Sequence, residues 1–342
     1  GKLVAKDAVE VNVVRYTGKN VILATGSYAK TLPGLEIDGE KIITSDHGTK
    51  MSYVPKSVIV LGGGVIGCEF ASVWKSFGSD VTIIEGLPHL IALEDESSSK
   101  QLERAFRKRG IKFELGVRFQ SAVKNADGVT VTLEDGKTFT AEVLMVSVGR
   151  GPVSANLGYE EQGISMDRGY VLVDDKCRTN VPGIWAVGDL IPTLQLAHVG
   201  FAEGILVAEE IAGLNPRPIN YDGIPRVTYS DPEVASVGLT TAEAKKRGHD
   251  VVELTYDLAG NGKAQILNTA GSIKLVAQKD GPVLGVHMVG ARVGELLAEA
   301  ELIYNWEARA SDVAPLIHAH PTLSEAMGEA HMALAGKPLH AH

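Results

Sequence analysis

The sequence of 342 residues predicts an α/β protein organised around a dinucleotide-binding unit. Apolar runs rich in β-branched residues at 58–61, 81–84 and 143–146 are typical of strands buried on both faces of a parallel sheet. Between the first two runs, apolar side chains recur at helical spacing from Ile66 to Phe77, and Gly78 ends that segment. Strand, helix and strand in this order form the repeating unit of an open parallel sheet.

A glycine-rich loop joins the first of these strands to the helix. Residues 62–67, Gly-Gly-Gly-Val-Ile-Gly, have the spacing G-x-G-x-x-G. Gly62 permits a tight turn, Gly64 lets a pyrophosphate approach the backbone, and Gly67 lets the helix pack close to the strand. The unsatisfied N–H groups at the start of the helix attract phosphates. The sequence therefore predicts a dinucleotide site, with a glycine-rich turn beside a surface acid as the alternative.

Two acids accompany this loop. Glu85 ends the second strand, 23 residues beyond Gly62. Its carboxylate can accept hydrogen bonds from a ribose 2′-OH and would repel a 2′-phosphate, which favours NAD over NADP. Glu69 lies on the first turn of the helix, where an acid complements the helix dipole.

Composition excludes several classes of partner. The net charge of −9 argues against nucleic acid, since phosphate binding needs basic clusters. No apolar run reaches transmembrane length, so we expect no membrane partner. The two cysteines, Cys68 and Cys177, lie 109 positions apart and form no disulfide framework. These features predict a cytoplasmic enzyme.

A histidine and glutamate cluster near the C-terminus is the main candidate for acid-base chemistry. Glu325 follows His320 by five positions, and such a carboxylate can fix the tautomer of an imidazole and raise its basicity. A zinc site formed with His318 and His331 is an alternative, although the spacing fits no common zinc motif. A capping box formed by Thr322 and Glu325 is another.

A third set of residues follows two further buried strands. Thr25, Gly26 and Ser27 come after the apolar run at 21–24, and Asp189 comes after the run at 184–187. An acid at the carboxyl end of such a strand faces the ligand crevice of an open sheet. A plain cap at the strand end is the alternative for Asp189.

Together these motifs resemble the pyridine nucleotide-disulfide oxidoreductase family over essentially the whole chain. The resemblance implies an FAD site with Asp189 on the ribityl chain and Ala197 beside the flavin ring. It implies His320 as the proton acceptor and Glu325 as its orienting carboxylate. The implied FAD-binding residues are Thr25, Gly26, Ser27, Asp189 and Ala197, and the NAD-binding residues are Gly62, Gly63, Gly64, Val65, Ile66, Gly67, Glu69, Glu85 and Gly149.

The same resemblance implies two Rossmann-like dinucleotide-binding domains, of which the FAD domain is incomplete here, and a C-terminal α+β dimerisation domain. We expect parts of the FAD domain at 1–50 and 153–222, the NAD-binding domain at 51–152 and the interface domain at 223–342. The family's N-terminal half, with its FAD-pyrophosphate loop and Cys-x₄-Cys redox pair, does not match any segment of this sequence. The lysine that would pair with Glu69 beside the flavin is missing as well.

The implied activity is the oxidation of protein-bound dihydrolipoamide by NAD⁺, through FAD and a redox disulfide. The implied partners are a second copy of the chain and the lipoyl domain of a 2-oxo acid dehydrogenase complex. Because the disulfide segment is absent, one alternative is a non-catalytic fragment that binds NAD and dimerises. Another is a different flavoprotein disulfide reductase, although Glu85 disfavours the NADP-dependent members.

Overall fold

The computed structural model describes residues 1–126 and 128–340, and the chain divides into two compact units. The first unit combines Gly1–Lys30 with Gly149–Tyr221. The second combines Thr31–Val148 with Asp222–His342. The chain therefore passes from the first unit to the second twice and returns once.

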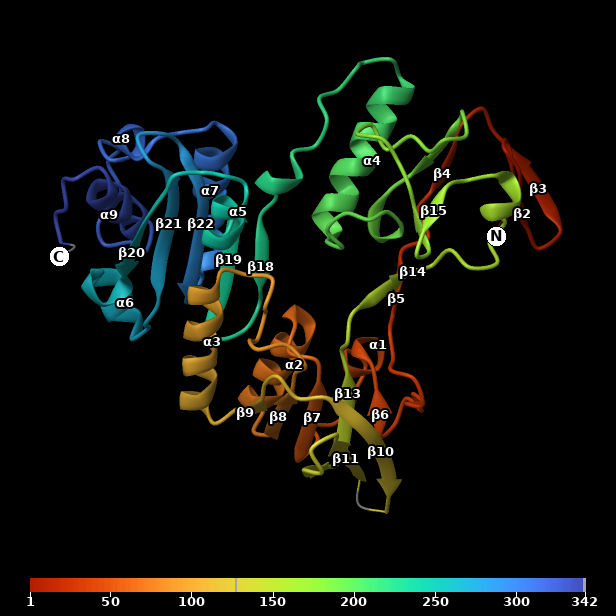
Figure 1. Cartoon of the computed structure of the whole chain (residues 1–342), viewed down its shortest axis with the longest axis horizontal. Helices are drawn as coiled ribbons and strands as arrows, with labels where there is room; N and C mark the ends of the chain where they lie inside the picture. The colour runs from red at the N-terminus through yellow and green to blue at the C-terminus, as the bar shows by residue number, and fades with distance from the viewer. Residues whose placement is uncertain (127, 341–342) are drawn as a thin grey trace. The chain divides into compact units, whose positions relative to one another are not determined.

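A parallel sheet of five strands forms the predicted nucleotide-binding part of the second unit (Figure 1). The burial of Val58 through Leu61 on the central strand agrees with the apolar run in the sequence. Two helices accompany the sheet, α2 (Val65–Ser76) and α3 (Glu96–Arg109). In spatial order the strands are β6 (Ile42–Ile43), β13 (Val143–Val146), β7 (Ser57–Leu61), β8 (Asp80–Ile84) and β9 (Lys112–Glu114).

The boundaries of this unit differ from the expected 51–152. Residues 31–50 belong to it, because β6 pairs in parallel with β13, with Ile42 opposite Leu144, and is buried. At the other end, β14 (Arg150–Pro152) pairs with β5 (Ser27–Ala29) in the first unit. These pairings join residues about a hundred positions apart, and a local sequence pattern does not reveal them.

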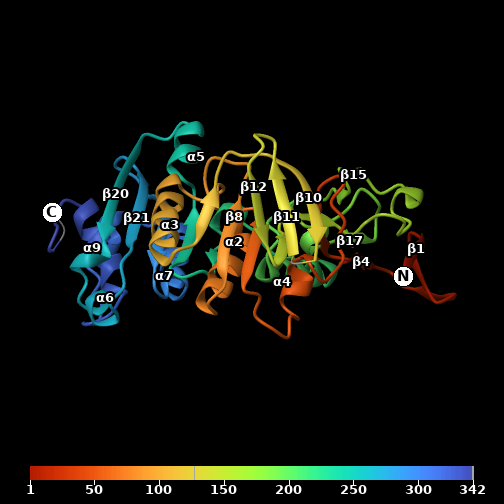
Figure 2. The same ribbon diagram turned by 90° about the horizontal axis from the view of Figure 1, so that it is seen from below.

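A three-stranded antiparallel sheet is inserted between β9 and β13. Its strands are β10 (Phe119–Asn125), β11 (Gly128–Leu133) and β12 (Thr138–Ala141), seen side by side in Figure 2. Alternate residues of β11, among them Val131 and Leu133, are fully buried in a cluster with Leu144. The period-two pattern of this strand thus attaches the small sheet to the parallel one.

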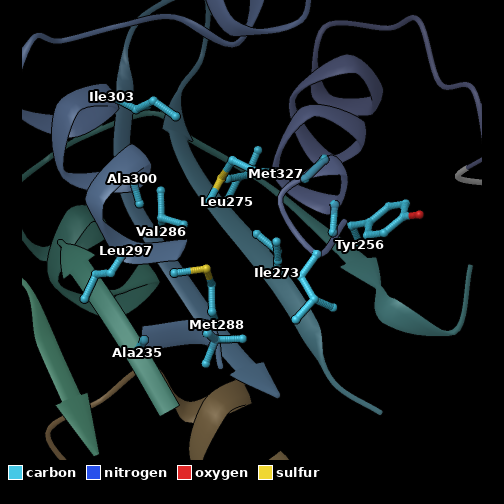
Figure 3. Packing of buried hydrophobic residues seen from close by; sticks show 14 of the residues in the cluster. Ala235, Tyr256, Ile273, Leu275, Val286, Met288, Leu297, Ala300, Ile303 and Met327 are labelled. Carbon is cyan, nitrogen blue, oxygen red and sulfur yellow. The ribbon is translucent and has the colours of Figure 1, made fainter. Parts of the chain in front are cut away.

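The C-terminal part of the second unit is an antiparallel sheet covered by helices, in agreement with the expected α+β domain. Helix α7 (Val293–Asn305) packs on β19 and β22, and α9 (Glu325–Leu334) packs on β20 and β21. Figure 3 shows Ile273, Leu275 and Met288 of the sheet directed toward these helices. In spatial order the strands are β18 (Arg226–Thr228), β19 (Glu233–Gly238), β22 (Val283–Gly290), β21 (Ser272–Gln278) and β20 (Val251–Asp257); the remaining helices include α5 (Thr241–Lys246), α6 (Gly262–Leu267) and α8 (Ala310–Val313).

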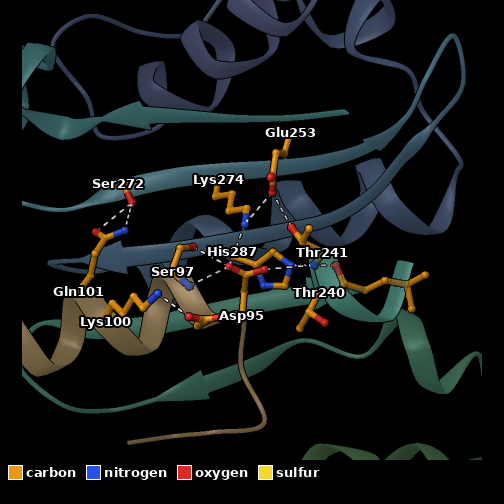
Figure 4. A network of polar contacts seen from close by, with 12 residues as sticks. Asp95, Ser97, Lys100, Gln101, Thr240, Thr241, Glu253, Ser272, Lys274 and His287 are labelled. Carbon is orange, nitrogen blue, oxygen red and sulfur yellow. Dashed lines mark hydrogen bonds and ion pairs between the residues drawn. The ribbon is translucent and has the colours of Figure 1, made fainter. Parts of the chain in front are cut away.

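A buried polar network connects α3 to this sheet (Figure 4). Asp95, the N-cap of α3, accepts hydrogen bonds from Ser97 N (3.0 Å), Thr241 N (3.1 Å) and Lys274 Nζ (3.0 Å). Glu253 forms a second ion pair with Lys274 at 2.9 Å. Because Asp95 is only 3% exposed, the network joins the nucleotide-binding and antiparallel parts within one compact unit.

The first unit contains a short parallel pair, β4 (Val21–Leu23) and β17 (Ile184–Ala186). Helix α4 (Ala197–Ile211) buries Val199, Leu206 and Val207. The unit also contains the antiparallel strands β1 (Lys2–Ala5), β2 (Ala8–Val11) and β3 (Val14–Thr17) and the pair β15 (Met166–Asp167) and β16 (Tyr170–Val171). Among the helices that the structure describes, none combines the length and apolar character needed to cross a bilayer.

Candidate active site

The turn between β7 and α2 requires glycine at two positions. Gly62 has φ +109°, and a Cβ there would lie 2.4 Å from the carbonyl oxygen of Ser147. A Cβ on Gly67 would lie 1.9 Å from the carbonyl oxygen of Gly62. The turn and the first turn of α2 are therefore in direct backbone contact, as the motif predicts.

The third glycine of the loop has open space beside it. A Cβ built on Gly64 has no neighbour within 4 Å, and the residue is exposed. Gly64 is the N-cap of α2 and makes no side-chain hydrogen bond, so the first amides of the helix, at Val65 and Ile66, remain available to a ligand. This open helix N-terminus beside a side-chain-free surface fits a dinucleotide pyrophosphate.

The acid at the end of β8 contacts the same loop. Glu85 Oε2 accepts the N–H of Gly63 at 2.5 Å, and Oε1 accepts the N–H of Leu87 at 2.7 Å. Each carboxylate oxygen retains a second lone pair. The carboxylate is thus fixed next to the loop with acceptor capacity left for a ribose hydroxyl, although NAD binding by Glu85 remains a prediction.

Glu69 is placed by the antiparallel part of its own unit. Its Oε1 accepts the backbone N–H of Tyr229 at 2.8 Å. Burial raises the pKa of Glu69, and this hydrogen bond opposes the rise. The side chain therefore has a structural partner on the segment after β18, and its predicted role beside the cofactors stays a prediction.

The structure brings the predicted flavin residues of the first unit together. Because β4 and β17 are parallel neighbours, the segments after their carboxyl ends meet at one edge. There Ser27 Oγ donates to Asp189 Oδ2 at 2.5 Å, and Thr25 Oγ1 donates to the Val153 carbonyl. Gly26, with φ +72° and no neighbour within 4 Å of a built Cβ, leaves the backbone open between them. An acid and a hydroxyl beside bare backbone suit a polyhydroxylated chain such as the ribityl group of FAD.

Arg150 is a member of this cluster that the sequence motifs did not single out. Its Nε donates to Ser27 Oγ at 2.6 Å and lies 3.9 Å from Asp189 Oδ2. The neighbouring Gly149, predicted to contact NAD, belongs to this first unit, where its carbonyl accepts the N–H of Lys30. Arg150 follows Gly149 directly, so the strand-end motif could have indicated it.

Glu203 is the second residue that sequence analysis missed. It lies on α4, is 0% exposed, and its Oε2 accepts the N–H of Gly188 at 2.6 Å. Its Oε1 accepts Thr193 Oγ1 at 2.9 Å and Tyr221 Oη at 3.0 Å. Ala197, predicted to lie beside the flavin, is the exposed first residue of the same helix.

The predicted histidine and glutamate pair is present in the C-terminal part. His320 Nδ1 lies 2.8 Å from Glu325 Oε1, and the His320 side chain is 76% exposed. With Nδ1–H donated to the carboxylate, Nε2 keeps its lone pair and can accept a proton. The geometry is that of an oriented general base.

The same carboxylate also forms the capping interaction. Glu325 Oε2 accepts the N–H of Thr322 at 2.7 Å, and the N–H of Glu325 is directed to Thr322 Oγ1 at 3.3 Å. Partial burial opposes ionisation of Glu325, but hydrogen bonds from Thr322 and His320 hold its pKa below the usual value. Glu325 can therefore both orient His320 and form the capping box with Thr322, because each role uses a different carboxylate oxygen.

The neighbouring histidines have separate partners. His318 Nε2 lies 2.8 Å from Glu299 Oε1 on α7, and a Cβ on Gly328 would come within 2.6 Å of His318 Nδ1. His331 is buried and donates Nδ1–H to the Met327 carbonyl at 2.7 Å. Within residues 1–126 and 128–340, no group of three histidine, cysteine, aspartate or glutamate side chains is arranged to hold a metal ion.

The two cysteines are both buried free thiols. Burial, followed by the charge of Glu203, raises the pKa of Cys177 to about 12. Burial likewise raises the pKa of Cys68 far above its ordinary value. Since the thiolate is the reactive form, neither side chain is suited to redox chemistry.

Comparison with known proteins now identifies the family. A family model described as pyridine nucleotide-disulphide oxidoreductase matches residues 1–204, and the model of its dimerisation domain matches residues 224–331. The chain belongs to this family. The prediction made from the glycine loop, the strand-end motifs and the histidine pair is confirmed, as is the fold class.

Similar proteins cover almost the whole chain. Dihydrolipoyl dehydrogenase from Bacillus subtilis is 43% identical over 329 residues, which are 94% of this chain and 69% of the relative. Dihydrolipoyl dehydrogenase from Cupriavidus necator is 41% identical over 350 residues, or 99% of this chain and 74% of the relative. The crystal structure of LpdA from Mycobacterium tuberculosis has a TM-score of 0.88 at 28% identity, covering 94% of this chain and 71% of that one.

These comparisons make the protein a member of a family of NAD-dependent flavoprotein disulfide oxidoreductases, whose cofactors are FAD and NAD. The C-terminal α+β part is a dimerisation domain.

Proposed function

We propose that the protein functions as a dihydrolipoyl dehydrogenase, which transfers two electrons from dihydrolipoamide to NAD⁺. The observation that carries this proposal is the contact of His320 Nδ1 with Glu325 Oε1 at 2.8 Å, where the loop that carries His320 meets the start of α9 in the dimerisation domain. The relatives of the same name, at 43% and 41% identity, support the choice of substrate.

His320 acts as the proton acceptor. Oxidation of a dithiol releases two protons and two electrons, and the attacking group must be a thiolate. His320 Nε2 takes a thiol proton, while Glu325 keeps the ring in the productive tautomer and stabilises the imidazolium. The exposure of the ring allows a substrate carried by another protein to reach it.

The remaining site residues hold the two cofactors. Gly62 to Gly67 and the start of α2 bind the NAD pyrophosphate, and Glu85 accepts the ribose hydroxyl. Ser27, Asp189 and Arg150 hold the ribityl chain of FAD. FAD held by these residues would supply two-electron transfer between a thiol pair and the nicotinamide of NAD⁺.

The redox disulfide is not formed by Cys68 and Cys177, which are buried and have raised pKa values. Because these are the only cysteines in the 342 residues, the disulfide has to be supplied from outside them. We propose that His320 serves such a disulfide across a homodimer formed through the dimerisation domain. The proposed protein partner is the lipoyl domain of a 2-oxo acid dehydrogenase complex. A cytoplasmic location belongs to the same proposal.

Steady-state assays with purified protein test the proposal. The protein is supplied with dihydrolipoamide and NAD⁺, and NADH formation is followed together with the visible flavin spectrum. We expect flavin absorbance, NADH formation, and weaker activity with NADP⁺ because of Glu85. A colourless protein that binds NADH without oxidising dihydrolipoamide would instead indicate a dimerising, NAD-binding protein without catalysis, and a preference for glutathione or Hg²⁺ would indicate another reductase of the family.

A further inference from the structure

Glu203 stands out among the buried groups because it joins three separate segments of the first unit. Its side chain projects from the second turn of α4 and is 0% exposed. One carboxylate oxygen accepts Gly188 N, and the other accepts Thr193 Oγ1 and Tyr221 Oη, at 2.6, 2.9 and 3.0 Å. The two ends of segment 188–193 are thus tied to one side chain.

This segment contains the acid of the flavin cluster. Gly188 has φ +72°, a left-handed conformation that favours glycine, and Asp189 follows it directly. Leu190, next in the chain, is fully buried, and Asp189 contacts Ser27 across the parallel strand pair. The direction of the Asp189 side chain is therefore set by the backbone that Glu203 holds.

A buried carboxylate is costly unless donors surround it, and Glu203 has three. All three are neutral groups, a backbone amide and two hydroxyls. Burial, followed by the charge of Glu203, raises the pKa of Tyr221. Apolar packing of α4 could be achieved by an apolar side chain, so the position of the carboxylate needs an explanation beyond packing.

We infer that Glu203 is a positioning residue of the flavin site, which holds the 188–193 turn in the conformation that presents Asp189 to the ribityl chain. This inference rests on the proposed flavin function of Asp189. It also adds a specific consequence: the turn should be ordered by Glu203 even before a cofactor binds. That consequence can be measured separately from flavin binding.

The first test is hydrogen exchange of the flavin-free protein, measured by mass spectrometry on peptides that span 186–196. Glu203→Met removes both acceptors at similar volume, so the N–H of Gly188 loses its partner, and we expect exchange in these peptides to accelerate about tenfold or more. Glu203→Gln retains one acceptor for Gly188, and its amide can donate to the two hydroxyls, so it should restore most of the protection.

A matched control separates local from general effects. Glu209→Met changes a partly exposed carboxylate on the same helix that is outside this set of contacts. We expect wild-type exchange at 186–196 in this variant. Unchanged exchange in Glu203→Met, or equal acceleration in Glu209→Met, would overturn the positioning role. Thermal unfolding of each variant shows whether a change is confined to the turn.

The second test is the dissociation rate of FAD from the flavin-loaded protein. Glu203→Met should accelerate FAD release about tenfold, and Glu203→Gln should differ little from wild type. If Glu203 acts through Asp189, combining Glu203→Met with Asp189→Asn should give much less than the product of the two separate effects. Independent, multiplicative effects would contradict the inference. Wild-type protein that holds no flavin would contradict the flavin part of the proposed function, while the exchange experiment still decides whether Glu203 orders the turn.

Discussion

At the scale of single residues, two carboxylates of the candidate site each make two different kinds of hydrogen bond. Glu325 orients His320 with one oxygen and caps the chain at Thr322 with the other. Glu85 fixes Gly63 and Leu87 and still has lone pairs for a ribose. In both cases the protein contacts hold the carboxylate in place before a ligand arrives, which lowers the cost of binding.

Replacement of Glu325 by Gln tests the first of these residues. The amide cannot stabilise an imidazolium as the carboxylate does, so we expect kcat with dihydrolipoamide to fall about tenfold to hundredfold. The capping contact can be retained, so the melting temperature should change little. Glu295→Gln, an exposed acid on α7, serves as the control and should keep wild-type kinetics. A wild-type kcat in Glu325→Gln would remove this residue from the mechanism.

Alanine substitutions at two glycines of the nucleotide loop should have different effects, one on NADH binding and the other on stability. A Cβ on Gly64 meets nothing, so Gly64→Ala should fold normally but obstruct the pyrophosphate and weaken NADH binding about tenfold. A Cβ on Gly67 meets the Gly62 carbonyl at 1.9 Å, so Gly67→Ala should lower the free energy of unfolding by more than about 2 kcal/mol. Calorimetric NADH titration and urea unfolding check the pair. Equal NADH affinity in Gly64→Ala and wild type would contradict the assignment of the loop.

At the scale of secondary-structure elements, α3 is attached to the antiparallel sheet by a polar network around its N-cap. Burial disfavours the charge on Asp95, but hydrogen bonds from Ser97 and Lys274 and the nearby His287 hold its pKa far below the usual value. Because the folded-state pKa lies below the unfolded one, the stabilisation is complete above about pH 4 and is lost as the pH falls through the folded-state pKa.

Replacing Asp95 should therefore lower the free energy of unfolding by an amount that depends on pH. We expect Asp95→Ala to lower the free energy of unfolding at neutral pH by about 3 kcal/mol, since Glu253 still neutralises Lys274. The difference from wild type should shrink as the pH falls below about 4. Urea unfolding at several pH values measures this difference. Glu96→Ala, which changes an exposed neighbour, should leave the stability close to that of wild type. If Asp95→Ala lowers the free energy of unfolding equally at every pH, the charge of Asp95 is not what stabilises the network.

The sequence predicted most of the elements because their apolar periodicities are local. The buried strands at Val58–Leu61 and Val143–Val146 have the expected places. The edge strand at Ile42–Ile43 pairs with β13 although it lies before residue 51, because two apolar residues do not specify a partner at Leu144. Pairing between residues so far apart depends on tertiary structure.

The residues of the candidate site also divide into those with a local sequence pattern and those whose contacts depend on tertiary structure. Motif residues such as Ser27, Asp189 and His320 were found because each stands at a strand end or beside a proline in a short recognisable pattern. Arg150 adjoins the predicted Gly149 but was not singled out, because its contact with Ser27 spans 123 positions. Glu203, whose contact with Gly188 spans 15 positions, has no motif beside it. A single arginine or glutamate in a sequence does not reveal what it contacts.

At the scale of the whole molecule, the dimerisation domain has exposed apolar side chains close to the proposed base. Ile317 is 98% exposed and Leu316 is 58% exposed, three and four residues before His320. Apolar side chains so exposed beside a functional loop are typical of an interface. The structure thus places an apolar contact surface next to the proposed base.

A charge at this surface should weaken the dimer. We expect Ile317→Glu to raise the dimer dissociation constant at least tenfold, because burying the carboxylate at an interface is costly. Sedimentation velocity over a range of concentrations measures the change. Val123→Glu, at an exposed position of β10, should leave the dimer intact. A dimer of unchanged stability in Ile317→Glu would place the interface elsewhere.

Steady-state turnover of His320→Gln with dihydrolipoamide and NAD⁺ tests the proposed role of His320 as the base for thiol oxidation. We predict a kcat at least about a hundredfold below wild type, with flavin content and NADH binding unchanged, because the glutamine cannot take up the thiol proton. Turnover equal to that of wild type would show that another group accepts the proton, and would contradict the proposed mechanism.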